Sequence, residues 1–179
     1  MSKLPEWAAE GRSKWRYCGQ ERPSFASIPE DGQESVWDYP RPPRSVHDAR
    51  EVVVRAGVVE IARTLNAIRV LETASPPTFY IPPGAVRAEF LHASTGISLC
   101  EWKGAAQYWT VAVPGQSLER VAWSYPDPFS GFVQIRGYLS FYPEHLECTV
   151  SGVRVLPQPG RFYGGWVTPE VCGPFKGSY

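Results

Sequence analysis

Proline and glycine recur along this sequence so often that long helices are disfavoured. The 179 residues include 18 prolines and 16 glycines, distributed along the chain and not confined to one tract. Proline lacks a backbone hydrogen-bond donor and glycine is conformationally flexible, so both residues tend to interrupt helices and strands. The pattern therefore favours short strands joined by turns. We predict a mainly β fold in one domain of short antiparallel strands.

Apolar and β-branched segments separated by turn residues mark the expected strands. Such segments flank Ala56-Gly57, Ala93–Gly96, Lys103-Gly104, Pro114-Gly115 and Ser151-Gly152. Two β-prone segments around a short glycine-containing turn are typical of a β-hairpin. The expected strands are therefore hairpin partners over residues 51–62, 86–92, 97–102, 105–113, 117–123, 146–150 and 153–157.

Two segments show helical features. Residues 5–12, PEWAAEGR, are compatible with one short helix near the N-terminus. In residues 128–142, Phe132, Ile135, Leu139 and Tyr142 recur at helical spacing, which predicts a helix there. Gly137 lies inside that segment and weakens such a helix by about 1 kcal/mol.

The first 48 residues are polar and rich in proline, and we interpret them as an N-terminal arm (residues 1–48). Residues 34–44, ESVWDYPRPPR, cannot form the interior of a helix, because proline favours extended geometry in the residue before it. We expect a polyproline-like segment whose Trp37 and Tyr39 pack on the body. A role of this arm in binding a protein partner stays open. The compact domain is expected over residues 49–177.

The charge balance and the distribution of apolar residues indicate which partners and which compartment to expect. Lys plus Arg and Asp plus Glu each number 18, so the chain lacks the basic excess of proteins that bind phosphate backbones, and we expect no nucleic-acid partner. It contains no apolar run of membrane-spanning length and no secretory signal, so we expect a cytoplasmic protein and no membrane partner. The oligomeric state stays open.

The four cysteines are separated too widely to form the C-x-x-C pairs of common zinc sites. They are Cys18, Cys100, Cys148 and Cys172. In a reducing compartment such cysteines are expected to be free thiols. We therefore predict no metal and no cofactor.

Several motifs identify a family resemblance. They are RVLETASPPTFYIPPGAV, CEWKGAAQYWTV, AWSYPDP, GYLSFYP and PQPGRFYGGWVTPEVCGPFKG, spread from about Glu34 to Gly177. In these motifs the chain resembles the bacterial family known as domain of unknown function 427. The resemblance implies a mainly β domain similar to the β-tent type. Members are sometimes labelled nucleotidyltransferase-like, but the sequence has no D-x-D carboxylate pair to hold magnesium.

Glu72 and Lys103 are the strongest candidates for catalytic or polar anchoring roles. Glu72 follows an apolar run, where partial burial favours acid–base use; the alternative is a carboxylate that caps a backbone amide or pairs with an arginine. Lys103 lies between Trp102 and Gly104 at a predicted strand end. It could hold an anion or act as a nucleophile, or it could be a solvated turn lysine. We expect Lys103 to reach an aromatic cleft and to approach Glu72.

Aromatic residues at strand ends and in loops are candidates for the walls of this cleft. We predict ligand-binding roles for Tyr80, Trp102, Trp123, Tyr125, Tyr163 and Trp166. Any one of them could instead fill the core. The most direct interpretation is a pocket for an unidentified small molecule. The alternatives are a transferase or hydrolase, with Glu72 as acid/base and Lys103 as anion anchor, and a protein-interaction module.

Overall fold

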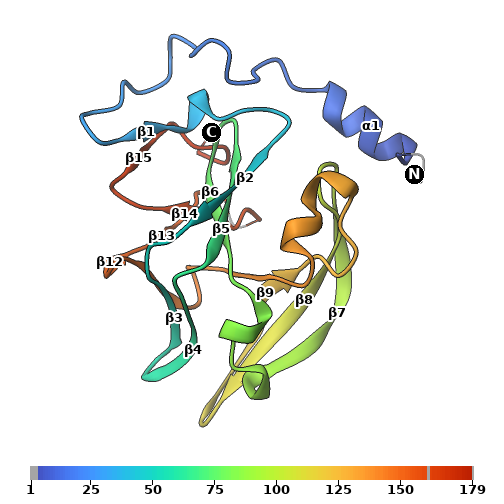
Figure 1. Ribbon diagram of the computed structural model, residues 1–179, viewed down its shortest axis with the longest axis vertical. Helices are drawn as coiled ribbons and strands as arrows, with labels where there is room; N and C mark the ends of the chain where they lie inside the picture. The colour runs from blue at the N-terminus through green and yellow to red at the C-terminus, as the bar shows by residue number, and fades with distance from the viewer. Residues whose placement is uncertain (1–3, 161, 179) are drawn as a thin grey trace.

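The computed structural model describes residues 4–160 and 162–178 and is mainly β (Figure 1). Its largest twisted sheet joins four antiparallel strands in the order β10-β9-β8-β7. The bounds are β7 Leu91–Cys100, β8 Gly104–Val113, β9 Gln116–Ser124 and β10 Leu139–Phe141. The turns at Lys103-Gly104 and Pro114-Gly115 connect neighbouring strands, which confirms that part of the predicted meander.

Two further antiparallel sheets complete the body. One has the order β12-β11-β3-β4 and the other the order β2-β5-β6. Their bounds are β2 Arg44–Asp48, β3 Val52–Ala56, β4 Val59–Thr64, β5 Ala67–Glu72, β6 Ser75–Tyr80, β11 Glu147–Val150 and β12 Val153–Arg154. The predicted hairpins around Ala56-Gly57 and Ser151-Gly152 are the β3–β4 and β11–β12 pairs.

Shorter elements tie the chain ends to this body. The strand β1 Glu34–Ser35 pairs in parallel with β15 Val171–Cys172, and β13 Leu156–Pro157 pairs with β14 Trp166–Val167. The α-helix α1, Glu6–Ser13, lies beside the β7–β8 turn (Figure 1). The short 3-10 helices are η1 Val36–Asp38, η2 Pro83–Ala85, η3 Ala88–Phe90 and η4 Ser130–Ile135.

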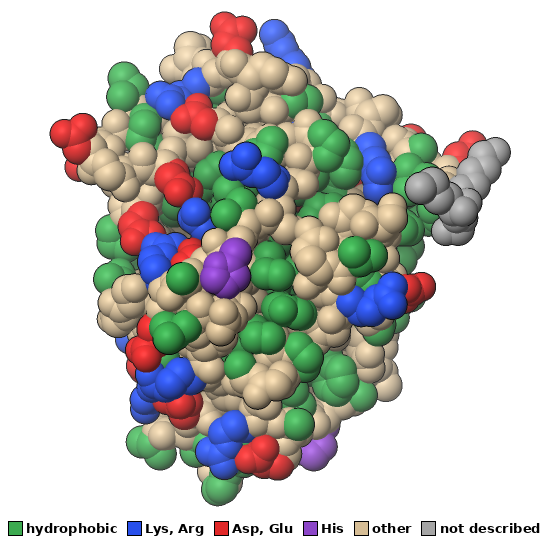
Figure 2. All heavy atoms as spheres, in the orientation of Figure 1, with side chains coloured by type: hydrophobic (Ala, Val, Ile, Leu, Met, Phe, Trp, Pro, Cys, Tyr) green, Lys and Arg blue, Asp and Glu red, His purple; other side chains and the backbone are tan. Residues whose placement is uncertain are grey.

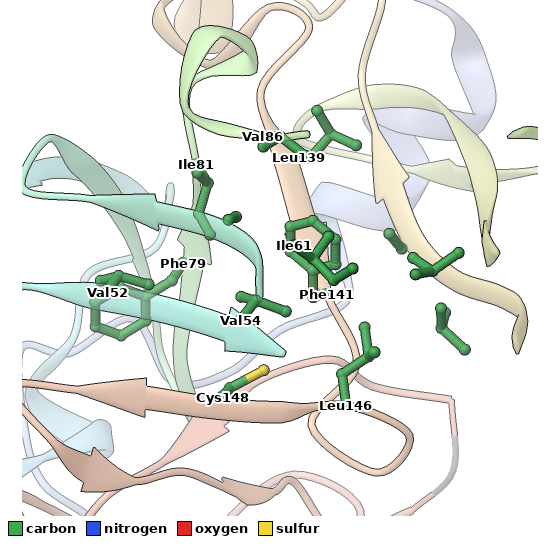
Figure 3. Packing of buried hydrophobic residues seen from close by; sticks show 14 of the residues in the cluster. Val52, Val54, Ile61, Phe79, Ile81, Val86, Leu139, Phe141, Leu146 and Cys148 are labelled. Atoms are coloured by element: carbon green, nitrogen blue, oxygen red, sulfur yellow. The ribbon is translucent and has the colours of Figure 1, made fainter. Parts of the chain in front are cut away.

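The main core lies between the large sheet and the β3–β4 and β6 strands. Figure 3 shows aliphatic and aromatic side chains from these elements packed together, with Val54, Ile61 and Phe141 at the centre. All three side chains are almost completely buried. Apolar burial of this kind is the dominant stabilising contribution to such a fold. The β-branched strands that the sequence indicated therefore supply the core.

The N-terminal segment packs on the body over much of its length. Trp37 is buried, and its ring nitrogen donates to the Pro174 carbonyl at 2.9 Å. Tyr39 is also buried, as expected for residues that anchor an arm. The last residues assigned to the arm form β2, which pairs along its whole length with β5. Residues 1–3 of the arm lie outside the described residues.

The helix predicted over residues 128–142 is wrong. The segment forms the 3-10 helix η4, whose Phe132 has a non-helical backbone (φ −129°, ψ 19°), and then the strand β10. Gly137 adopts φ +71°, which ends any right-handed helix there. The apolar residues matched one helical face by coincidence, since Ile135 and Leu139 belong to different buried clusters. The α-helix that does form, α1, is the short one compatible with residues 5–12.

The hairpin predicted around Ala93–Gly96 is also wrong. Residues 91–100 form the single strand β7, and the register against β8 shifts between Ala93 and Ile97. Gly96 adopts φ +84° within this strand. A glycine at positive φ can produce a bulge as well as a chain reversal, and here it produces the bulge.

Charged side chains of both signs are interspersed on the surface. Figure 2 shows acidic and basic side chains next to one another along one side of the face drawn, with hydrophobic side chains reaching the surface between them. Several form ion pairs, for example Arg63 with Glu51 and Glu60. On this face, therefore, the two signs of charge are mixed and do not form separate patches.

Candidate functional site

A cavity of about 230 Å³ opens between the large sheet, the β5–β6 hairpin and the C-terminal segment. Its walls come from segments that are far apart in the sequence. Six of the eight predicted site residues line it: Glu72, Tyr80, Lys103, Trp123, Tyr125 and Tyr163. The structure thus brings both polar candidates and four of the aromatic candidates together.

The other two predicted residues lie elsewhere. Trp102 is buried next to this cavity but does not line it, and the guanidinium of Arg12 in α1 covers its ring at 4.8 Å. Trp166 is completely buried in the main core, with its ring stacked on Phe79 at 5.0 Å. Its ring nitrogen donates to the Phe141 carbonyl at 2.9 Å. Trp166 therefore has a structural position in which no ligand can reach it without unfolding the core.

Lys103 is held in the tight β7–β8 turn. Gly104 follows at φ +98°, a conformation that favours glycine, and the Lys103 carbonyl accepts from the amide of Phe129 at 3.2 Å. Only 7% of Lys103 is exposed. Its ammonium lies 5.9 Å from the ring centre of Tyr125 and 5.6 Å from that of Phe132. The solvated turn lysine considered from the sequence is therefore not what the structure shows.

Within the described part of the chain, the ammonium of Lys103 forms no ion pair with a carboxylate. Among the residues that the structure describes, no carboxylate oxygen lies within 4.0 Å of it. Burial acts to lower the pKa of Lys103, and negative charge on Cys100, Tyr80 and Glu72 acts to raise it above its ordinary value; Tyr80 keeps its proton at neutral pH and so takes no part there. Lys103 therefore remains charged at neutral pH, which suits an anion anchor and disfavours an amine nucleophile.

Glu72 ends β5 and is bound by an arginine that sequence reasoning missed. The Arg41 guanidinium donates to the Glu72 carboxylate at 2.6 Å, and the Arg41 side chain is only 2% exposed. Arg69, the nearest arginine to Glu72 in the sequence, pairs with Glu34 and Asp48. Lys103 and Glu72 face the same cavity without forming an ion pair.

Neutral phenols add hydrogen-bond donors to the cavity wall. Burial raises the pKa of Tyr80, Tyr125 and Tyr142, so all three hydroxyls keep their protons at pH 7. Tyr108 donates its hydroxyl to Ser98 at 2.8 Å. The wall thus combines protonated donors with aromatic faces, including the Trp123 ring.

Three further cavity residues have roles that the sequence did not suggest. The Tyr142 ring lies 4.5 Å from that of Trp123. A Cβ at Gly164 would lie 2.1 Å from the Trp123 ring, so the glycine lets backbone approach the indole closely. Lys176 points its ammonium between Trp15 and Tyr163, at 4.7 Å and 4.6 Å. Gly164 therefore packs against the Trp123 indole at the cavity wall.

The described residues also bear on disulfides, metal sites and membrane-spanning helices. All four cysteines lie in described parts of the chain, and none forms a disulfide. Over residues 4–160 and 162–178, no three His, Cys, Asp or Glu side chains gather in an arrangement that could hold a metal ion. Within the same residues, no helix has both the length and the apolar character needed to cross a membrane.

The protein is thus a mainly β domain with a partly enclosed cavity. The wall of this cavity is rich in aromatic residues and contains the buried side chain of Lys103. The chain belongs to the family described as domain of unknown function DUF427, whose model matches residues 44–152 and is labelled NTP_transf_9. This confirms the family resemblance found in the motifs. Comparison with curated proteins gives no match.

Proposed function

We propose that this cavity binds a small cyclic molecule through an anionic group that contacts Lys103. The observation that carries the proposal is Lys103, a lysine only 7% exposed at the wall of an aromatic cavity, whose ammonium has no carboxylate within 4.0 Å among the described residues. Burying an unpaired charge is unfavourable by several kcal/mol, so such groups are normally paired. An anionic ligand would supply the missing partner.

The surrounding groups suit the rest of such a ligand. Tyr80 and Tyr125 offer phenol hydroxyls that could donate to anionic or carbonyl oxygens. Trp123 and Tyr142 offer ring faces on which a planar or sugar-like ring could pack. A few polar groups among aromatic walls are typical of small-molecule sites.

The volume limits the size of the ligand. An engineered apolar cavity of about 150 Å³ accommodates benzene. A cavity of about 230 Å³ therefore has room for one six-membered ring with one or two small substituents. A nucleoside triphosphate is much larger and would place most of its atoms outside the enclosed space.

The same geometry favours binding over catalysis. Acid–base use of Glu72 would need a carboxyl group free to exchange protons with a ligand, but Arg41 occupies its carboxylate. The transferase or hydrolase alternative therefore depends on a ligand that displaces this contact. Turnover of a bound ligand that stops when Glu72 is replaced by Gln would favour that alternative.

Isothermal titration calorimetry at low ionic strength tests the proposal, with benzoate as an anionic probe and benzyl alcohol as its neutral counterpart. We expect benzoate to bind with a Kd below about 1 mM, equivalent to about 4 kcal/mol, and benzyl alcohol at least tenfold more weakly. Lys103→Met should weaken benzoate by tenfold or more, since a charge-assisted hydrogen bond contributes about 1.5–3 kcal/mol.

Lys14→Met is the matched control, because Lys14 is exposed and pairs with Glu10 on α1. It removes the same charge from the protein but leaves the cavity intact. Equal loss of benzoate binding in both variants would show a general charge effect. That outcome, or no binding of benzoate to the unaltered protein, would contradict the proposal.

A further inference from the structure

We infer that the ligand carries two negative charges, and that Lys176 binds the second. This inference rests on the proposed function, because it concerns the same cavity. Lys176 lines the cavity together with Lys103 but comes from the C-terminal segment, outside the part of the chain that matches the family model.

The backbone around Lys176 is fixed on both sides. Its amide donates to the Ala74 carbonyl at 2.7 Å, and its carbonyl accepts from the Gln158 side chain at 2.7 Å. Gln158 in turn accepts from the amide of Gly165 at 3.1 Å. Lys176 therefore leaves the backbone at a defined point beside the cavity, unlike a lysine in a loose tail.

The side chain of Lys176 is positioned as well as its backbone. The Trp15 and Tyr163 rings flank the ammonium at 4.7 Å and 4.6 Å. Trp15 also packs against the Arg41 guanidinium at 3.8 Å. Aromatic faces attract a cation without neutralising it, so Lys176 keeps its capacity to bind an anion.

Within the described residues, the two lysines of the cavity wall are not paired with its two glutamates, Glu72 and Glu101. Among the described residues, neither Lys103 nor Lys176 has a carboxylate within 4.0 Å, and Arg41 already engages Glu72. Glu101 is the remaining acidic residue in the wall. Its backbone carbonyl accepts from Arg12, and its Cβ packs against Gly11 of α1. Two ammonium groups thus face one small cavity without ion-pair partners.

Charge and size together define the class of ligand. Two unpaired ammonium groups favour a dianion, and the volume admits a single ring. A ring bearing a phosphate monoester and a ring bearing two carboxylates share this chemistry, since a phosphate monoester carries nearly two negative charges at neutral pH. The two differ in whether the charges are adjacent or separated across the ring.

Calorimetric titration of the full chain with three probes tests the inference. Benzoate carries one negative charge, phenyl phosphate carries two on one group, and terephthalate carries two on opposite sides of the ring. We expect at least one of the two dianions to bind tenfold or more tightly than benzoate. Tighter phenyl phosphate would indicate adjacent charges, and tighter terephthalate would indicate separated ones.

Variants of Lys176 then assign the gain to this residue. In Lys176→Met, the ratio of the benzoate Kd to the dianion Kd should fall from ten or more to about one, whereas Lys176→Arg should retain most of the preference. Lys14→Met should keep the full ratio. If Lys176→Met does not fold, which circular dichroism will show, Lys176→Gln replaces it with the same expected ratio.

The outcomes separate this inference from the proposed function. If benzoate binding depends on Lys103 but no dianion binds better than benzoate, the second charge is wrong and the proposed function stands. A dianion preference that persists without Lys176 also contradicts the inference. If none of the three probes binds the unaltered protein, both proposals fail together.

Discussion

Replacing Lys103 by methionine should leave the stability of the unliganded protein nearly unchanged. Methionine has a similar length, fills the same space and removes only the charge. If the ammonium serves a ligand and not the fold, its loss has little effect in the empty protein. The contrasting change is Arg41→Met, which removes the partner of the Glu72 carboxylate.

The structure sets the expected magnitudes at neutral pH. Burial of the Lys103 ammonium is unfavourable by several kcal/mol. Its contacts with the Tyr125 and Phe132 rings return about 0.5–2 kcal/mol each, and the nearby Glu72 charge adds to them. These contributions nearly cancel, so Lys103→Met should change the free energy of unfolding by less than about 1 kcal/mol.

Arg41→Met should behave differently. The Arg41 guanidinium is almost fully buried, and the Glu72 side chain is 17% exposed. Removal of the guanidinium therefore leaves the largely buried Glu72 carboxylate unpaired. Breaking such a pair costs about 3–5 kcal/mol. The loss of the Trp15 contact at 3.8 Å adds to this cost.

Urea unfolding at pH 7, followed by tryptophan fluorescence, measures both changes, with Lys14→Met as the control for loss of an exposed lysine. The unaltered protein and Lys103→Met should unfold at similar urea concentrations, and Arg41→Met at a clearly lower one. A loss of 3 kcal/mol or more in Lys103→Met would show that Lys103 serves the fold, and the reasoning would then be refuted.

Three further changes test other parts of the structure. Trp166→Ala should destabilise the protein by about 3–5 kcal/mol in the same urea assay, because it empties a completely buried site; a loss under 1 kcal/mol would contradict the core position. Gly164→Ala should displace the Trp123 ring and shift its fluorescence emission, and an unchanged spectrum would show that the segment moves away freely. Burial acts to raise the pKa of Asp48, but hydrogen bonds from Arg50 outweigh it and lower the pKa. Asp48 therefore contributes stability above about pH 4 that is lost as pH falls through its folded-state pKa. In Asp48→Asn, the free energy of unfolding should accordingly decrease less steeply as the pH is lowered.

Local patterns predicted most of the hairpins and several residues of the cavity wall. Hairpins such as the one around Ala56-Gly57 combine a turn glycine with β-branched neighbours, and both signals are local. The four aromatic candidates that line the cavity lie near strand ends or in the C-terminal loop, where a side chain can face a cavity. Lys103 was found for the same reason, since a turn places it at the rim of a sheet.

The errors and omissions involve contacts between distant segments. Arg41 lies 31 positions before Glu72 in a proline-rich segment, and nothing in its neighbourhood indicates a buried side chain. Lys176 reaches the cavity only because the C-terminal segment packs against the β5–β6 turn and against Trp15. The helical spacing of Ile135 and Leu139 also led to a wrong helix prediction. Leu139 lies in a strand and packs in a different buried cluster from Ile135. Such pairings depend on the tertiary arrangement and leave no signal in a short window of sequence.

A crystal structure with 4-bromobenzoate tests the central claim most directly, because the anomalous signal of bromine locates the ring independently of the carboxylate. We expect the ring between Trp123 and Tyr125 and the carboxylate about 2.7–3.0 Å from the Lys103 ammonium, as in a charge-assisted hydrogen bond. Bromine signal only outside the cavity, or a bound carboxylate more than 4 Å from that ammonium, would contradict the account.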